Sequence, residues 1–469
     1  MDLTAPLHQQ IADLEAKRVS ARELLDAHVA RVERLDPAIN SVVTLDIDAA
    51  RAAAASIDEG RSSGSVQGAL AGVPITIKDA IATAGLRSTG GAVELRDHVP
   101  QRDAAVVSKL RAEGAVVFGK TNLPRWSADY QSYNEIFGTT NNPWDLARTP
   151  GGSSGGAAAA VAMGFSPFEI GSDIGGSIRL PASFCGVYGH KPSFGVVPTY
   201  GYLDNADYHR SVADVNVFGP LARSVDDLEF VFNLIAGPNP DDAPAWRLDL
   251  PPPSAVELGD FRVAAWFDDT LGELDPTLTA VYADLVESLD AAGAQIDTTA
   301  RPGIDPRLAA QLGMILIGSA TELAETPEDL AERRTSGDLL THRDWDEMDR
   351  QRGMVRTAWT EFFSNIDVLL CPVTCVPPFK HVHSAEGSNF SQAVLSDYGN
   401  RPYRELLYWN SLIGSAYLPV TTVPVGHTEA GLPVGVQVVA PYLSDWTALA
   451  FARCVEDIMG GYEPPPLAR

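Results

Sequence analysis

Hydrophobic positions recur at helical spacing over residues 5–57, where Leu14, Leu24, Leu25 and Val29 stand among Ala, Glu and Arg. This spacing predicts N-terminal helices. From about residue 70 the pattern changes to short β-branched runs, which are separated by helical and glycine-rich stretches and lie at residues 73–77, 116–119 and 168–170. Such alternation predicts α/β layering.

Further strand-like runs lie near the end of the chain, at residues 368–374, 418–425 and 434–439, and an apolar periodicity over about 446–459 predicts an amphipathic helix after them. Both parts of the chain are therefore expected to complete the same sheet. Between them, the proline-rich residues 237–257 predict an extended connector or surface loop.

Composition narrows the class of protein. The chain has 469 residues, of which 45% are hydrophobic and 20% charged, a balance typical of a folded protein with a large core. Thirty-five Lys and Arg against 61 Asp and Glu leave a formal charge of −26. This charge disfavours binding to nucleic-acid phosphates and to anionic membranes.

The compartment follows from three further observations. The chain does not begin with the apolar stretch that a secretory signal requires. The longest small apolar run, residues 157–163, is far shorter than the roughly 18–20 residues that span a bilayer. Four cysteines are too few for a disulfide framework. We therefore expect a cytoplasmic protein without a membrane segment.

Two glycine–serine clusters lie close together, Thr149-Pro-Gly-Gly-Ser-Ser-Gly-Gly and Ser172-Asp-Ile-Gly-Gly-Ser-Ile-Arg. The first runs into four alanines, residues 157–160, which are the best helix formers, so its serines are expected at a turn that opens a helix. This argues against a flexible linker. Neither cluster has the pattern of a phosphate-binding P-loop.

The second cluster follows a strand-like run, so Ser177 is expected just after a tight glycine turn. Backbone amides at such a turn can hold the negative oxygen of an acyl-transfer intermediate. The candidate donors are the amides of Ile174, Gly175, Gly176 and Ser177. An ordinary strand-to-helix turn, with Ser177 as a capping residue, is the alternative.

A nucleophilic serine needs a base, and the histidines offer little. His190 is expected to be a packed loop residue, and His381 and His383 lack the further ligands that a metal site needs, so we expect no metal. Lys78 ends a largely apolar strand. Burial there can lower the pKa of a lysine by up to 3–5 units, which would make Lys78 a base at neutral pH. A solvated lysine at a strand end is the alternative.

Together, Lys78 in VPITIKD, Ser153 in PGGSSGG and Ser177 in SDIGGSIRLP resemble the motifs of the amidase signature family of serine hydrolases. The separation of the two serines, 24 residues, also agrees with the family (177 minus 153). The similarity covers nearly the whole chain and includes GKTNLP, FGTTNNPWD, FCGVYGHKP, DVLLCPVT and GLPVGVQVVAP.

The resemblance implies one large α/β domain over residues 1–469, with a central mixed, twisted sheet that helices cover on both faces. Its parts would be an N-terminal helical segment, a catalytic core, a variable region that shapes access to the site, and C-terminal strands with a helix, over residues 1–65, 66–205, 206–364 and 365–469.

The resemblance also implies roles for single residues. Ser177 would be the nucleophile, Ser153 a bridging serine that follows a cis peptide bond at Gly152–Ser153, and Lys78 the base. The chain would then be an amidase that acts on linear amides through an acyl-enzyme, with carbamates and esters as further substrates. Ser154, Asp173 and Arg179 would support the serine loops.

Substrate specificity is less clear from the sequence. The segment that begins at Arg125 aligns with the stretch that lines the acyl pocket in relatives, and Trp126, Ser127 and Tyr130 are the candidates for substrate contact. Core packing is an equal interpretation for Trp126. We expect small-molecule substrates, no cofactor, and a monomer or homodimer.

Three rival functions remain open. The first is a cysteine hydrolase that uses Cys185, although a small buried residue is the simpler role for it. The second is the glutamine-hydrolysing component of a tRNA-dependent amidotransferase, against which the charge of −26 weighs. The third is a catalytically silent binding protein that keeps the fold.

Overall fold

The computed structural model describes residues 2–65, 67–203, 212–321, 331, 333–335, 339–383 and 394–469. Part of the variable region that the sequence predicted, residues 206–211, 322–330, 332 and 336–338, therefore lies outside the described residues.

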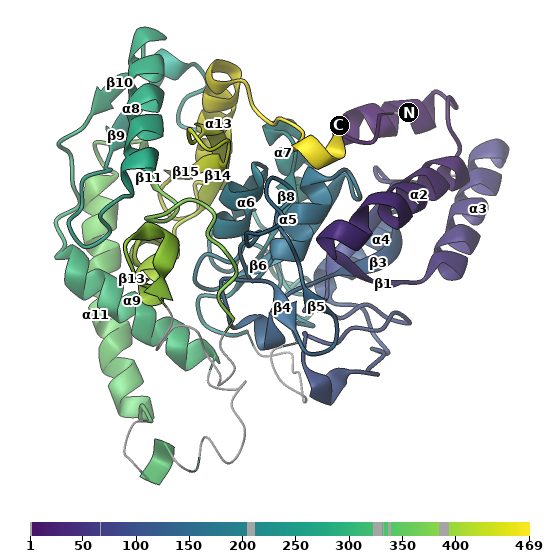
Figure 1. Ribbon diagram of the computed structural model, residues 1–469, viewed down its shortest axis with the longest axis horizontal. Coiled ribbons are helices and arrows are strands. Elements are labelled where there is room, and N and C mark those ends of the chain that lie inside the picture. Colours follow the sequence, from purple (N-terminus) through teal and green to yellow (C-terminus); the bar gives the residue numbers. More distant parts are fainter. Residues whose placement is uncertain are drawn as a thin grey trace.

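A mixed eight-stranded sheet forms the centre of the molecule (Figure 1). The three strands at one edge, β10, β9 and β11, run parallel to one another. All other neighbouring strands of this sheet are antiparallel. In spatial order the strands are β10 (Gln295–Asp297), β9 (Arg262–Ala265), β11 (Val368–Pro372), β15 (Pro433–Val439), β14 (Val420–His427), β7 (Tyr188–Lys191), β8 (Val217–Ala222) and β6 (Phe168–Asp173). Late and early strands thus share one sheet, as the hydrophobic pattern predicted.

A second, three-stranded sheet lies beside the edge strand β6. In it β3 (Val116–Thr121) pairs with β1 (Val42–Leu45) in antiparallel and with β2 (Pro74–Lys78) in parallel orientation. The described residues also contain two short strand pairs, β4 (Tyr133–Asn134) with β5 (Gly138–Thr139) and β12 (Val394–Leu395) with β13 (Arg401–Pro402). Because β2 packs against β6, the last residues of both strands meet, and these are the residues around Lys78 and Asp173.

Helices cover both faces of the large sheet, and α2 and α3 pack against the small one. The helices of the described residues are α1 (Leu7–Glu15), α2 (Ala21–Ile39), α3 (Ile47–Ser63), α4 (Ala105–Ala112), α5 (Gly155–Ala162), α6 (Arg179–Cys185), α7 (Val225–Ile235), α8 (Pro276–Ala291), α9 (Pro306–Thr321), α11 (His342–Phe362), α12 (Tyr408–Gly414) and α13 (Asp445–Met459). Two consecutive residues of β7 show the two faces, since neighbouring side chains of a strand point to opposite sides. A Cβ at Gly189 would meet Ile178 and Ala182 at α6, whereas the His190 ring bonds to Asp445 of α13.

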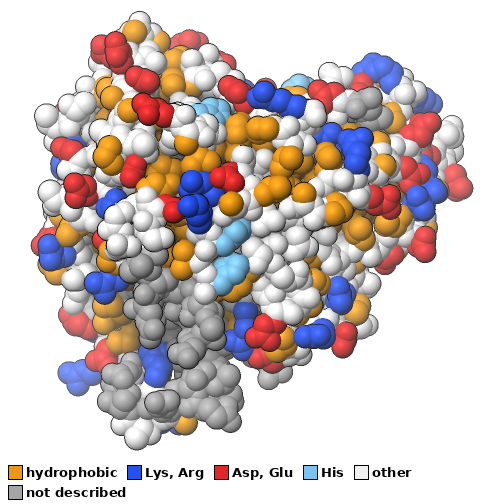
Figure 2. All heavy atoms as spheres, in the orientation of Figure 1, with side chains coloured by type: hydrophobic (Ala, Val, Ile, Leu, Met, Phe, Trp, Pro, Cys, Tyr) orange, Lys and Arg blue, Asp and Glu red, His pale blue; other side chains and the backbone are white. Residues whose placement is uncertain are grey.

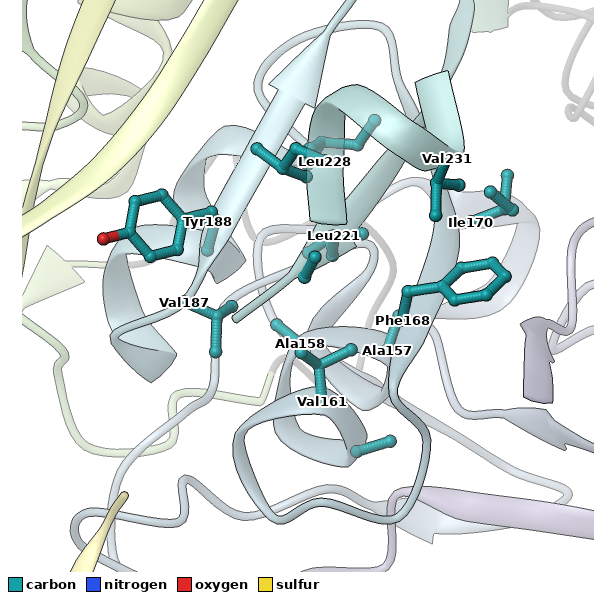
Figure 3. Packing of buried hydrophobic residues seen from close by; sticks show 14 of the residues in the cluster. Ala157, Ala158, Val161, Phe168, Ile170, Val187, Tyr188, Leu221, Leu228 and Val231 are labelled. Atoms are coloured by element: carbon teal, nitrogen blue, oxygen red, sulfur yellow. The ribbon is translucent and has the colours of Figure 1, made fainter. Parts of the chain in front are cut away.

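The alanine-rich helix α5 is buried on all sides. All of its residues are buried, and Ala157 to Ala162 have no exposed surface, as expected for a short helix without a polar face. Around it pack α6, β6 and β8, and Phe168, Leu221 and Leu228 belong to the same buried hydrophobic cluster (Figure 3). The first turn of this helix is therefore held in a rigid setting, and Ser154 stands at its N-terminus.

The N-terminal helices that the sequence predicted are α1, α2 and α3. Helix α2 begins where Ser20 and Glu23 form a reciprocal capping box. The two ends of the chain lie side by side (Figure 1), and the Arg31 guanidinium donates to the Ala468 carbonyl at 2.7 Å. The predicted loop at residues 237–257 contains neither helix nor strand. The division of the chain into four parts stays a prediction.

Helices α9, α11 and α12 form a second core with β11 and β14, built around Trp266, Trp359 and Trp409. Helices α9 and α12 approach closely, since a Cβ at Gly313 would lie 2.5 Å from the Ser411 carbonyl oxygen. Among the helices described, none is both long and apolar enough to cross a bilayer. Acidic and basic side chains are both spread over the visible face of the molecule (Figure 2).

Candidate active site

Lys78 is fully buried at the end of β2. Its amine contacts three hydroxyl groups, Ser153 Oγ at 2.6 Å, Ser172 Oγ at 2.8 Å and Ser154 Oγ at 2.9 Å. Burial lowers the pKa of Lys78 to about 7, and the nearby carboxylates of Asp173 and Glu169 oppose this shift. A lysine with this pKa is neutral in about half of the molecules at pH 7, whereas an ordinary lysine is almost entirely charged.

Ser153 and Ser154 stand where the first glycine–serine cluster enters α5. The peptide bond between Gly152 and Ser153 is cis, as the resemblance implied. Glycines are required before and after these two serines, because the backbone of other segments approaches closely there. A Cβ at Gly152 would lie 2.6 Å from the Gln131 nitrogen, and one at Gly156 would lie 2.5 Å from the Asn122 nitrogen. Sequence and packing thus place Ser153 beside the lysine.

Ser177 lies in the second cluster, between β6 and α6, and is 7% exposed. The two clusters are joined where the Ser154 amide donates to the Ser177 carbonyl at 3.1 Å. Within the described part of the chain, no hydrogen bond links Ser177 Oγ to Ser153 Oγ. The structure therefore brings Lys78 and Ser153 into contact and places the loop of Ser177 next to them.

Asp173 and Arg179 hold the loop that contains Ser177. Both side chains are fully buried and form a two-pronged ion pair, with Arg179 Nη2 at 2.9 Å and Nε at 3.1 Å from the carboxylate. The carboxylate also accepts from the amides of Gly176 at 2.8 Å and Ile178 at 3.0 Å. Burial opposes ionisation of Asp173, but the Arg179 charge and these hydrogen bonds lower its pKa to about 2. Asp173 is thus an anion that organises the turn.

Of the four backbone amides at this turn, only one donates a hydrogen bond to a group of the described residues. The Gly176 amide is occupied by Asp173, whereas those of Ile174, Gly175 and Ser177 donate to no group among the described residues. Three of the four predicted oxyanion donors are therefore unused. Gly176 has φ of +116°, and a Cβ there would lie 2.5 Å from Asn410 Cγ, so only glycine fits this turn.

The three predicted substrate contacts lie in different surroundings. Trp126 is buried against Ala92 and Leu95, which is the packing role that the sequence left open. Its Nε1 and the Oγ of Ser127 have no hydrogen-bond partner among the described residues, so contact with a substrate stays a prediction for both. Tyr130 is 2% exposed, and its hydroxyl donates to the Gly175 carbonyl.

Several residues at the site were missed by sequence reasoning. Ser172 contacts Lys78, and Ser132 Oγ donates to the Gly151 carbonyl at 3.1 Å. Glu169 is fully buried and accepts from Thr76 Oγ1 at 2.6 Å, and burial raises its pKa to about 7. The sequence does contain one signal for Glu169, because a glutamate between Phe168 and Ile170 interrupts an apolar run and so indicates a buried charge.

The residues that the sequence set aside lie apart from the lysine. His190 is buried between Thr421 Oγ1 and Asp445 Oδ1, at 3.0 and 3.2 Å, which fits a packed residue. Cys185 is buried, and burial raises the pKa of its thiol far above the usual range. His383 stacks on Tyr133, and no group of three metal-ligating side chains occurs in the described ranges.

Known proteins resemble this chain over most of its length. Residues 23–449 match the model of the Amidase family. The chain is 33% identical to an acylamidase from Rhodococcus erythropolis, covering 96% of this chain and 94% of that protein. It is 30% identical to a glutamyl-tRNA(Gln) amidotransferase subunit from a Picosynechococcus species, covering 99% of this chain and 100% of that protein.

Among solved structures, that of a bacterial aryl acylamidase of the amidase signature family superposes with a TM-score of 0.82. The two chains are 25% identical, and the match covers 97% of this chain and 96% of the aryl acylamidase.

Proposed function

Because the chain belongs to the amidase signature family of hydrolases, we propose that Lys78, Ser153 and Ser177 form its catalytic triad and cleave carbon–nitrogen bonds through an acyl-enzyme. The observation that carries this proposal is the 2.6 Å contact between Lys78 Nζ and Ser153 Oγ in a fully buried setting. A solvated lysine at this position would be charged and could not accept a proton.

In the first half of the reaction, neutral Lys78 accepts the proton of Ser153 while Ser153 accepts that of Ser177. The Ser177 oxygen attacks the substrate carbonyl, and the amides of Ile174, Gly175 and Ser177 bind the negative oxygen that results. Collapse of this intermediate breaks the carbon–nitrogen bond, and the departing nitrogen takes a proton from Ser153, which Lys78 then replaces.

In the second half, water attacks the acyl group and its proton passes through Ser153 to Lys78. The bond from the acyl carbon to Ser177 Oγ breaks, the proton returns to Ser177, and the acid leaves. This sequence needs Ser177 Oγ within hydrogen-bond distance of Ser153 Oγ. Such catalytic contacts are often long without substrate and shorten when it binds.

The proposed substrates are small linear amides with aryl or alkyl groups, and the names of the acylamidase relatives support this class. Carbamates and esters present the same carbonyl to the same nucleophile, so we include them as further substrates. No cofactor takes part in this mechanism. We propose that the protein acts in the cytoplasm as a monomer or homodimer, with the four cysteines as thiols.

A second candidate function is favoured by the similarity to the glutamyl-tRNA(Gln) amidotransferase relative. A protein of that kind would release ammonia from glutamine for a partner enzyme. The formal charge of −26 counts against a role near RNA.

The test is a turnover screen of the purified chain alone with aryl amides, alkyl and nylon-type amides, carbamates, esters and glutamine. We expect hydrolysis of simple amides, and labelling of Ser177 by a fluorophosphonate probe. A chain that is silent on simple amides and hydrolyses glutamine only with a partner would be part of an amidotransferase. A site that neither turns over nor reacts with the probe would be a binding protein.

A further inference from the structure

One short segment, residues 129–132, contacts both glycine–serine clusters. At the first cluster, Ser132 Oγ donates to the Gly151 carbonyl and accepts from the Gly155 amide at 3.0 Å. At the second cluster, the Tyr130 hydroxyl donates to the Gly175 carbonyl. The segment is therefore packed between the two loops that carry the proposed catalytic serines.

The peptide unit between Gly175 and Gly176 is held at both of its edges. Its carbonyl accepts from Tyr130, and its N–H donates to Asp173 Oδ1 at 2.8 Å. In a trans peptide unit the C=O and N–H point in opposite directions. The two contacts therefore act on opposite sides of one plane, and the plane cannot rotate unless one of them breaks.

The orientation of this plane matters for its neighbours. The amide of Gly175 belongs to the preceding peptide unit and that of Ser177 to the following one, and both are proposed oxyanion donors. Two glycines separate these units, so no side chain restrains their dihedral angles. The direction of the free amides therefore depends on the contacts that fix the unit between them.

Tyr130 is suited to hold such a contact. Its ring is buried with Leu180, Phe184 and Leu406, in a cluster that also contains Tyr403. Burial raises the pKa of the Tyr130 hydroxyl well above its usual range, so it stays protonated and able to donate. Its hydroxyl is directed to the backbone of the loop.

We propose that Tyr130 is a positioning residue, which fixes the Gly175–Gly176 peptide unit so that the flanking amides face the oxygen of the substrate carbonyl. This inference rests on the proposed acyl transfer at Ser177. It differs from the sequence-based expectation that Tyr130 contacts the substrate. The difference can be measured, because a positioning residue acts on the transition state and a contact residue acts on binding.

The test is the Tyr130→Phe variant, which removes the hydroxyl and keeps the ring. We expect kcat to fall at least about 10-fold with KM within about 2-fold, since loss of one oxyanion donor costs about 10²–10³ in kcat. Inhibition by a trifluoromethyl ketone, whose adduct places a negative oxygen in the same site, should weaken by the same factor. A raised KM with unchanged kcat, or no change at all, would overturn the proposal.

Tyr282→Phe is the matched control. It removes another buried tyrosine hydroxyl, one that donates to the Gly435 carbonyl of β15 at 2.9 Å, outside residues 129–132. Its loss should affect stability without changing the contact to Gly175. An equal fall of kcat in this variant would mean that general packing is responsible, and the proposal would be wrong.

A second variant covers the case in which Tyr130→Phe does not fold. p-Aminophenylalanine at position 130 keeps the ring and a weaker donor, so we expect a reduced kcat at an unchanged KM. A shifted KM here contradicts the proposal. Ser177→Ala tests the proposed acyl transfer separately from the role of Tyr130. Activity that survives in this variant would refute the acyl transfer itself.

Discussion

The amine of Lys78 lies 2.6 Å from the hydroxyl of Ser153, and neither side chain has any exposed surface. Desolvation favours the uncharged amine, so the same burial that disfavours a charge in the core leaves an amine that can accept a proton near pH 7.

The first prediction concerns the dependence of activity on pH. Only neutral Lys78 can accept a proton, and its pKa is about 7. The value of kcat/KM should therefore fall about tenfold per pH unit below 7 and level off above about 8. Initial rates from pH 5 to 9 measure this, and a flat profile would contradict a lysine base.

The second prediction is a change in stability. Lys78 has a lowered pKa in the folded state, so from about pH 7 to 10.5 the unfolded chain binds the proton that the folded chain lacks. Stability from this group therefore rises with pH in that range. Compared with Lys78→Met, the wild type should gain up to about 4 kcal/mol of unfolding free energy between pH 7 and 10. Denaturant unfolding of both proteins at each pH gives the difference, and a constant difference would mean that Lys78 is charged when folded.

The third prediction separates the serine from the cysteine mechanism. Ser177→Ala should abolish measurable turnover, because it removes the attacking oxygen. Cys185→Ala should keep most of it, because the Cys185 thiol is buried and protonated. Steady-state rates of the two variants on one aryl amide decide the matter, and the reverse pattern would make Cys185 the nucleophile.

The fourth prediction tests Glu169. Its negative charge raises the pKa of Lys78. Because the pKa of Glu169 is itself raised to about 7, this charge is only partly present near pH 7 and fades at lower pH. Glu169→Gln removes the part that remains and keeps an oxygen for Thr76, so the acid limb of the pH profile should move to lower pH by only a fraction of a pH unit. Asp79→Asn is the control, because Asp79 is an equally buried carboxylate that does not contribute to the pKa of Lys78. If the acid limb of the pH profile moves equally in both variants, Glu169 has no specific effect on the pKa of Lys78.

The fifth prediction concerns the ion pair of Asp173 and Arg179. Asp173→Asn leaves a buried guanidinium without its counter-charge, which typically costs about 3–5 kcal/mol. Thermal unfolding at pH 7 should show the loss. Because the pKa of Asp173 is lowered to about 2, its contribution is present above pH 3.8 and is lost as the pH falls through 2. The two proteins should therefore converge in stability only in strong acid.

The sequence predicted those features that depend on local pattern or on a motif. Alternation in the apolar run before Lys78 predicted β2, and the two serine motifs located both loops. Contacts between distant segments could not be predicted. Tyr130 meets Gly175 across 45 residues and Tyr403 meets Asp129 across 274, and no periodicity carries such information. The order of strands, with β6 at the edge beside β2, depends likewise on pairing that hydrophobicity does not specify.

The three hydroxyl groups around Lys78 have a consequence for turnover. An ammonium group offers three hydrogens, whereas a neutral amine offers two and a lone pair, and a hydroxyl group can serve either as acceptor or as donor. Ser153, Ser154 and Ser172 can therefore satisfy both forms simply by reorienting their hydrogens. A carboxylate partner would have trapped the cation. In the proposed reaction, three serines would let each proton reach and leave Lys78 while the heavy atoms stay in place.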